Sequence, residues 1–307
     1  MAAEELSVSF KNSYKEISFQ APWGVIAAKA WGPEDGKPFL GLHGWLDNAN
    51  TFDKLPENIR FVAIDFPGHG QSSHRWPGNM PYLHFEYVAD TKKVVSQLGW
   101  KKFSIIGHSM GASVASLYAG SFPNEVENII LIDYGGPPLQ NQYKPARVLA
   151  RYATRMSEMK PRTPRAYESV EAAAARREEP YAGITLRKED ALLLTERGTR
   201  VIKEGVIFSH DQGLKAAIYP FVVPQSSLKL ILSKIQCAVL VLEGTDSVRF
   251  SNEDRLARLS VTCQHAKFHV WKSVQGGHHF HLDNPEQTAQ EIKQFLALCH
   301  DLCSSKL

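Results

Sequence analysis

The sequence is poor in cysteine, with four among 307 residues, and their spacing does not match the paired pattern of a zinc module. A disulfide framework is therefore excluded as the basis of the fold, and we expect reduced thiols. Two of the four flank His300 at helical spacing, which is more typical of one helix face than of metal ligands. The cysteines are Cys237, Cys263, Cys299 and Cys303.

The chain also lacks an apolar run long enough to cross a membrane. Its N-terminus carries Glu4 and Glu5 and no apolar segment typical of a secretory signal. A formal net charge of +3 is too small to indicate a partner such as nucleic acid. No glycine-rich nucleotide fingerprint, P-loop or His-Glu-x-x-His box is present, so we expect no cofactor and no metal.

What the sequence does contain is Gly-His-Ser-Met-Gly at residues 107–111, directly after the apolar run 103–106. This order predicts a strand, a sharp turn and a helix, with the hydroxyl of Ser109 raised on the turn. Glycine on both sides is needed because side chains would collide where the strand and the helix approach. The pattern indicates a nucleophilic serine.

Strands and helices alternate along most of the chain. Apolar runs predict strands at 39–42, 60–66, 103–106, 128–133, 237–242 and 267–271, after a hairpin at 17–31. Helical spacing predicts helices at 84–98, 110–122 and 285–302. This alternation is typical of an α/β fold, in which helices cover both faces of a mostly parallel sheet.

Residues 140–235 break this rhythm, because they show helical segments and no clear buried strand. We predict a core formed by residues 1–139 and 236–307, with a helical cap inserted at 140–235. Residues 141–204 contain 14 Lys and Arg against nine Asp and Glu. Such a basic surface is usually only solvated; the functional alternative is that it attracts an acidic acyl substrate.

The chain resembles the α/β-hydrolase fold family. Residues 43–45 match its His-Gly-x turn, and residues 65–72 match its Asp-x-x-Gly-x-Gly-x-Ser turn. The runs 22–24, 27–32 and 42–49 are similar to the serine hydrolase-like proteins related to the fly protein Kraken. The resemblance implies an eight-stranded, mostly parallel sheet with helices on both faces and an inserted helical cap.

A catalytic serine needs a base that takes its proton and an acid that orients the base. The family's late loop reads Gly-x-His, then about six residues, then Pro-Glu. Counting back from Pro285 selects His278 as the base, with His279 and His281 as the alternatives. A metal site made of these three histidines is the less favoured interpretation.

The acid departs from the family pattern. The family places it three residues after the glycine that ends the seventh strand, and here that position is Ser247. Asp246 stands one residue earlier and is the preferred acid. Asp133, at the end of the run 128–133, is the alternative, because some α/β-hydrolases take their acid from the strand that follows the nucleophile's helix.

The resemblance further implies an oxyanion hole formed by the backbone N–H groups of Trp45 and Met110. Because a serine forms an acyl-enzyme, we expect hydrolysis of small-molecule esters or thioesters, with a small acyl substrate as the partner. The alternative is a ligand-binding or catalytically weak protein of this fold that acts as a receptor or a partner-binding module.

The last three residues, Ser305, Lys306 and Leu307, form the tripeptide that is read as a peroxisomal address. We therefore expect the peroxisomal import receptor as a partner, and residence in the peroxisome with a pool in the cytoplasm.

A fluorescent tag at the N-terminus should give a punctate signal that overlaps a peroxisomal marker. Deleting residues 305–307, or covering the terminal carboxylate with a C-terminal tag, should leave the signal diffuse, because the receptor needs a free and exposed end. Puncta that persist after the deletion would mean that the tripeptide is incidental.

Overall fold

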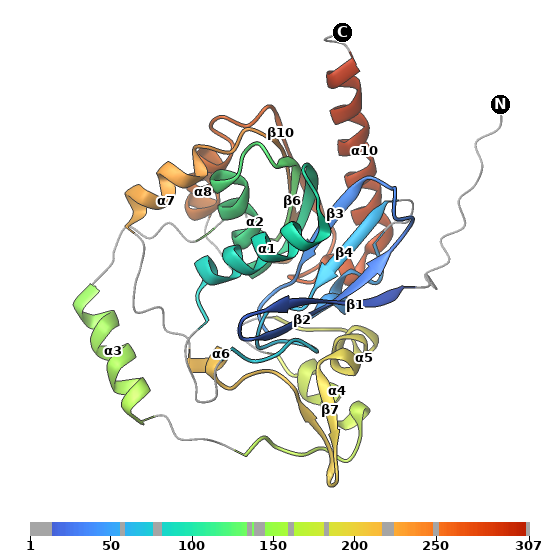
Figure 1. Ribbon diagram of the computed structural model, residues 1–307, viewed down its shortest axis with the longest axis vertical. Coiled ribbons are helices and arrows are strands. Elements are labelled where there is room, and N and C mark those ends of the chain that lie inside the picture. Colours follow the sequence, from blue (N-terminus) through green and yellow to red (C-terminus); the bar gives the residue numbers. More distant parts are fainter. Residues whose placement is uncertain are drawn as a thin grey trace, which may run out of the picture.

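An eight-stranded sheet runs through the centre of the molecule (Figure 1). Its order is β1-β2-β4-β3-β5-β6-β9-β10, and β2 pairs antiparallel with both β1 and β4, whereas the other neighbours are parallel. The strands are β1 (Lys15–Ala21), β2 (Gly24–Trp31), β3 (Pro38–Leu42), β4 (Arg60–Ile64), β5 (Phe103–His108), β6 (Val126–Ile132), β9 (Ala238–Gly244) and β10 (His269–Val274). The predicted α/β class and the mostly parallel sheet are confirmed.

The computed structural model describes residues 14–55, 59–75, 82–133, 137, 145–158, 163–180, 184–216, 224–247 and 252–304. The predicted targeting tripeptide at 305–307 lies outside these ranges. Within them, no helix has the length and apolar character needed to cross a membrane.

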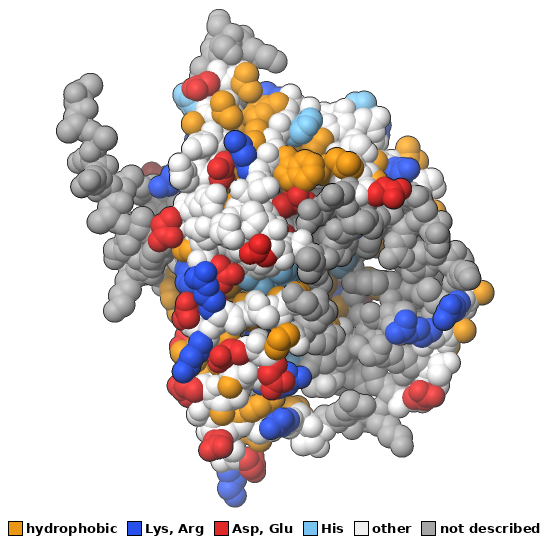
Figure 2. Space-filling model, turned by 180° about the vertical axis from the view of Figure 1, so that it is seen from behind, with side chains coloured by type: hydrophobic (Ala, Val, Ile, Leu, Met, Phe, Trp, Pro, Cys, Tyr) orange, Lys and Arg blue, Asp and Glu red, His pale blue; other side chains and the backbone are white. Residues whose placement is uncertain are grey.

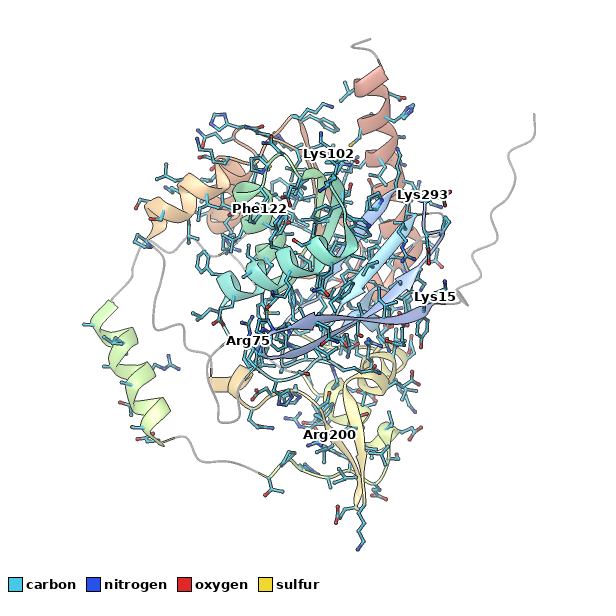
Figure 3. All side chains as sticks on the ribbon, in the orientation of Figure 1. Lys15, Arg75, Lys102, Phe122, Arg200 and Lys293 are labelled. Carbon is cyan, nitrogen blue, oxygen red and sulfur yellow. The ribbon has the colours of Figure 1, made fainter. Side chains whose placement is uncertain are left out.

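Helices cover the sheet from both sides. One face carries α1 (His84–Leu98), α2 (Met110–Ser121), α7 (Gln225–Leu232) and α8 (Asn252–Thr262), and the other carries α9 (Phe280–Asp283) and α10 (Pro285–Ser304). Each face has its own apolar core; Val114 and Leu117 of α2 lie in the first and Phe295 of α10 in the second. Phe122 and Lys293 accordingly lie on opposite sides of the sheet (Figure 3).

The segment between β6 and β9 is not wholly helical. It contains α3 (Pro145–Glu158), α4 (Val170–Glu178), α5 (Lys188–Arg197), β7 (Thr199–Ile202), β8 (Gly205–Phe208) and α6 (Gly213–Ala216), followed by α7. The prediction that this segment is helical alone is wrong, since it also contains the hairpin β7–β8. Val206 and Ile207 of β8 are buried, in a strand only four residues long. A run this short gives little periodicity in the sequence.

Paired charges attach this segment to the core. The guanidinium of Arg197, at the end of α5, donates to both oxygens of Asp65 at 2.9 and 3.1 Å and to Glu16 at 2.6 Å. The turn η1 (Ala49–Phe52) contacts α5, and Asn50 donates to the carbonyl of Leu193 at 2.8 Å. These contacts fix α5 beside the edge of the sheet at which the parallel strands end.

Several histidines belong to the buried interior. His43, His69, His108 and His281 are at most 1% exposed. His43 shows why the neutral ring is preferred, since one nitrogen accepts from Phe66 N–H at 2.8 Å while the other donates to the carbonyl of Gly44 at 2.7 Å. Burial lowers the pKa of all four below the usual 6.5 of an imidazole, so they are neutral in the folded protein.

The free energy of unfolding should therefore fall as the pH is lowered from 7.5 to 5. The unfolded chain binds protons at these histidines below about pH 6.5 and the folded chain does not, which costs up to about 1.4 kcal/mol per pH unit for each buried ring. Urea unfolding over this range measures the slope. His281→Asn should make it shallower, whereas the exposed control His300→Asn should not; equal slopes for wild type and both variants would contradict this account.

Candidate active site

The serine predicted to be the nucleophile stands on a strained turn between β5 and α2. Ser109 has φ 53° and ψ −113°, a left-handed conformation that residues with a side chain rarely adopt. Its N–H donates to the carbonyl of Ile132 at 3.0 Å, which holds the turn against β6. A Cβ on Gly107 would lie 2.6 Å from the carbonyl oxygen of Gly111, so the predicted need for glycine beside the serine is confirmed.

A histidine–carboxylate pair lies at the end of the neighbouring strand. His278 Nδ1 lies 2.5 Å from Oδ2 of Asp133, the residue that follows β6. The same carboxylate accepts from Ser247 Oγ at 2.6 Å and from Gly244 N–H at 3.2 Å. Because a carboxylate accepts the Nδ1 proton, the lone pair of His278 is on Nε2.

The electrostatics of this pair set the protonation state of both groups. Burial lowers the pKa of His278 to about 3, although the bond to Asp133 acts in the opposite direction. Burial alone would raise the pKa of Asp133, but the hydrogen bonds from His278, Ser247 and Gly244 outweigh it and lower that pKa. At neutral pH the histidine is therefore neutral and the aspartate ionised.

The prediction that Asp246 orients the histidine is wrong, and the alternative, Asp133, occupies the position. Asp246 is exposed, and its carboxylate accepts from Thr245 Oγ1 at 3.3 Å and from Gln275 Nε2 at 3.4 Å. The physical reason is that β6 and β9 are adjacent, so either strand end can deliver a carboxylate to His278. Ser247, which fills the family's acid position, donates a hydrogen bond to Asp133 instead.

The structure separates the three histidines of the late loop. His278 contacts Asp133, His281 Nε2 lies 2.8 Å from Thr51 Oγ1, and His279 Nε2 lies 3.0 Å from Asp47 Oδ2. Of the three, His278 therefore holds the position expected of a triad base; its catalytic role stays a prediction.

The two predicted oxyanion donors come from adjacent strand ends. Trp45 follows β3 and Met110 begins α2 directly after β5, and Leu42 of β3 is paired with Gly107 of β5. Parallel neighbours bring both turns to the same edge of the sheet, which is where Ser109 lies. This placement agrees with the expected donor positions, and the donor role itself stays a prediction.

A second polar cluster lies beside the first. Asp47 Oδ2 is 3.0 Å from His279 Nε2 and 3.5 Å from His108 Nδ1, and Asp47 Oδ1 accepts from Arg177 of α4 at 2.7 Å. Burial would raise the pKa of Asp47, but its contacts with His279 and Arg177 help to hold it well below its usual value. Asp47, His108 and His279 bring three possible ligand atoms within 4.8 Å of one another.

A cavity of about 520 Å³ opens next to this second cluster. Its wall combines residues of the turn that follows β3 with residues of the inserted segment. Trp45, Asp47 and His279 line the cavity. The remaining lining includes Arg177, Ile184 and Phe208, which are all contributed by the inserted segment. A ligand in this cavity would therefore lie between the sheet and the insertion.

Sequence reasoning missed Asp47, His108 and Arg177. Each lies in a different part of the chain, and no fixed spacing links a loop aspartate, the residue before a nucleophile and a helix arginine. The sequence indicated His279 only as an alternative base, or as one of three histidines in a less favoured metal site. The one usable signal was the excess of histidines at 278–281, which exceeds what a triad needs.

Comparison with known proteins agrees with this architecture. The family model of the alpha/beta hydrolase fold matches residues 37–179. A serine hydrolase-like protein of Danio rerio is 36% identical over 309 residues, which cover 94% of this chain and 90% of that protein. A bifunctional esterase/perhydrolase, DCH, of Acinetobacter calcoaceticus is 35% identical over 121 residues, covering 37% of this chain and 42% of that protein.

Among solved structures, a hypothetical protein from Pseudomonas aeruginosa PAO1 superimposes with a TM-score of 0.80 at 32% identity, covering 92% of this chain and 99% of that one. The fold, the strained serine turn and the near full-length similarity all point to the same family. This chain belongs to the serine hydrolase-like proteins of the alpha/beta hydrolase fold.

Proposed function

We propose that this protein hydrolyses esters or thioesters of small acyl compounds through an acyl-enzyme on Ser109, with His278 as the base and Asp133 as the acid. The observation that carries the proposal is the buried 2.5 Å contact between His278 Nδ1 and Asp133 Oδ2. It lies at the end of β6, the strand next to the one that presents Ser109.

In the acylation step, Ser109 Oγ attacks the acyl carbon while His278 Nε2 accepts the hydroxyl proton. The ring of His278 is unprotonated at neutral pH, so Nε2 has a lone pair for this proton, and the contact with Asp133 opposes the loss of basicity that burial causes. Asp133 stabilises the positive ring that results, and it is itself fixed by Ser247 and Gly244. The ring then returns the proton to the departing alkoxide or thiolate.

The tetrahedral oxygen that forms in this step carries a full negative charge. Two preset N–H donors, from Trp45 and Met110, would stabilise it, a contribution that is often the largest single term in such catalysis. In the second half of the cycle, a water molecule replaces the alcohol or thiol. His278 removes its proton as the water oxygen adds to the acyl carbon, and the ring then returns that proton to Ser109 Oγ as the acyl–serine bond breaks and the carboxylic acid leaves.

The cavity lies beside Trp45, whose N–H is a predicted oxyanion donor, and its lining favours a largely uncharged substrate. Trp45, Ile184, Leu186 and Phe208 give it apolar walls. Of its basic side chains, Arg177 is paired with Asp47 and Arg176 with Glu179. The relative from Acinetobacter is named as an esterase and perhydrolase, which also favours ester chemistry.

The same pairing weakens the idea of a basic cap that attracts acidic substrates. Among the described parts of the insertion, Arg187 contacts Asp283, and Arg197 contacts Asp65 and Glu16. Figure 2 shows acidic and basic side chains interspersed over the face that α4, α5 and β7–β8 present. A mixed surface of this kind produces little net field.

A fluorophosphonate probe should label the wild-type protein at one serine, Ser109, because only a hydroxyl with an adjacent base reacts readily. Ser109→Ala should abolish the labelling. The matched control is Ser121→Ala, at the exposed end of the same helix, which should be labelled like wild type. Peptide mapping by mass spectrometry reads the site, and labelling at a different serine would refute the assignment.

Asp133→Asn should lower kcat for an activated ester by about 10³- to 10⁴-fold, because the amide cannot stabilise the charged ring or hold the required tautomer. Asp246→Asn is the matched control and should change kcat less than about threefold. Thermal melting of both variants separates a loss of chemistry from a loss of folding. A larger loss for Asp246→Asn would restore the rejected acid; mild losses for both would favour a ligand-binding or catalytically weak protein.

A further inference from the structure

We propose that Asp47, His108 and His279 form a binding site for one divalent transition-metal ion of the Zn²⁺ type. The three side chains converge from the β3 turn, the end of β5 and the late loop. Each is buried, with exposures of 3%, 0% and 6%. The proposed hydrolysis does not use any of the three.

The protonation state of His108 gives the first argument. Its Nε2 lies 3.0 Å from the carbonyl oxygen of His278, which can only accept, so Nε2 carries the proton. The lone pair is then on Nδ1, which is buried and has no hydrogen-bond partner among the described residues. That lone pair faces Asp47 Oδ2 at 3.5 Å. No hydrogen bond joins these two atoms, an arrangement that a cation would stabilise, and a bound ion would replace the proton that His279 Nε2 now shares with Asp47 Oδ2.

The distances give the second argument. A tetrahedral ion with bonds of about 2.0 to 2.1 Å keeps its ligand atoms about 3.3 Å apart. Asp47 Oδ2 lies 3.5 Å from His108 Nδ1 and 3.0 Å from His279 Nε2, on either side of that value, and all three atoms lie within 4.8 Å of one another, so the two imidazoles would move closer together on binding. Two imidazoles and one carboxylate are the donor set of many zinc sites, whereas Ca²⁺ and Mg²⁺ prefer oxygen alone.

The surroundings of two of the three side chains match those of known metal ligands. Such histidines usually donate their second nitrogen to a carbonyl, as His108 does to His278, and a ligating carboxylate is itself hydrogen-bonded, as Asp47 is to Arg177. The second nitrogen of His279, Nδ1, has no hydrogen-bond partner among the described residues. Gly44 closes one side, since a Cβ there would lie 2.9 Å from His108 Nδ1. Asp47 and His279 line the cavity, which gives an ion a route in and leaves its fourth position open.

The location makes the site functionally relevant. His108 immediately precedes Ser109, and His279 immediately follows His278. A bound ion would link the serine turn to the histidine loop without touching either proposed catalytic atom. The test of the site measures bound metal ions per chain and not catalysis, so its outcome is independent of the proposed hydrolysis.

Equilibrium dialysis of the full chain against Zn²⁺, followed by elemental analysis, should find one ion per chain. Asp47→Asn and His279→Gln should each weaken binding by at least tenfold, because each removes one of three ligands. The matched control is His281→Asn. Its ring centroid lies 4.3 Å from that of His108, but its Nε2 contacts Thr51 rather than the site, and binding should be unchanged.

Wild-type protein loaded with Co²⁺ provides a readout that needs no variant, since a four-coordinate site gives intense visible absorption. Circular dichroism confirms that each variant is folded before its binding is compared. Substoichiometric binding, or binding that survives both ligand substitutions, would overturn the proposal and assign the ion to surface histidines. A doubly protonated His108 in ¹⁵N NMR, with no metal bound, would show that a proton fills the gap and would also overturn it.

Discussion

The close contact between the start of α2 and the end of β3 is the constraint on which the site depends. A Cβ on Gly111 would lie 1.9 Å from the carbonyl oxygen of Leu42, so the helix reaches the sheet only without a side chain there. This contact presses the turn at Ser109 into its left-handed conformation. The strain stored in the turn is compensated by the fully buried residues of β5 and α2 on either side.

Once the serine is fixed, the acid can come from either of two neighbouring strand ends. β6 and β9 are paired in parallel, and Gly244 at the end of β9 donates to Asp133 at the end of β6. The carboxylate therefore lies one strand away from the position that the wider family uses. Ser247 occupies that family position and donates a hydrogen bond to Asp133. A carboxylate can orient the histidine from either strand, because only its position beside the ring matters and not its position in the sequence.

The sequence was sufficient where a local pattern determines the structure. Period and turn residues predicted the strands and the serine turn, because each depends on neighbours in the chain. The resemblance to the family's late loop selected His278, the histidine nearest Asp133. It failed for Asp246, since a count along one loop cannot reveal that an adjacent strand supplies a competing carboxylate. The hairpin β7–β8 was missed because its strands are four residues each. The cluster at Asp47 depends on three segments that only the tertiary structure brings together.

The inserted segment is connected to the site through that cluster. Arg177 of α4 donates to Asp47 at 2.7 Å and to the carbonyl of Leu46 at 3.1 Å. Asp47 in turn contacts His279, and His108 donates to the backbone of His278. A displacement of α4 would remove the positive partner of a buried carboxylate, which is costly in a low-dielectric interior. This charge pairing therefore couples the position of the insertion to the geometry of the histidine loop.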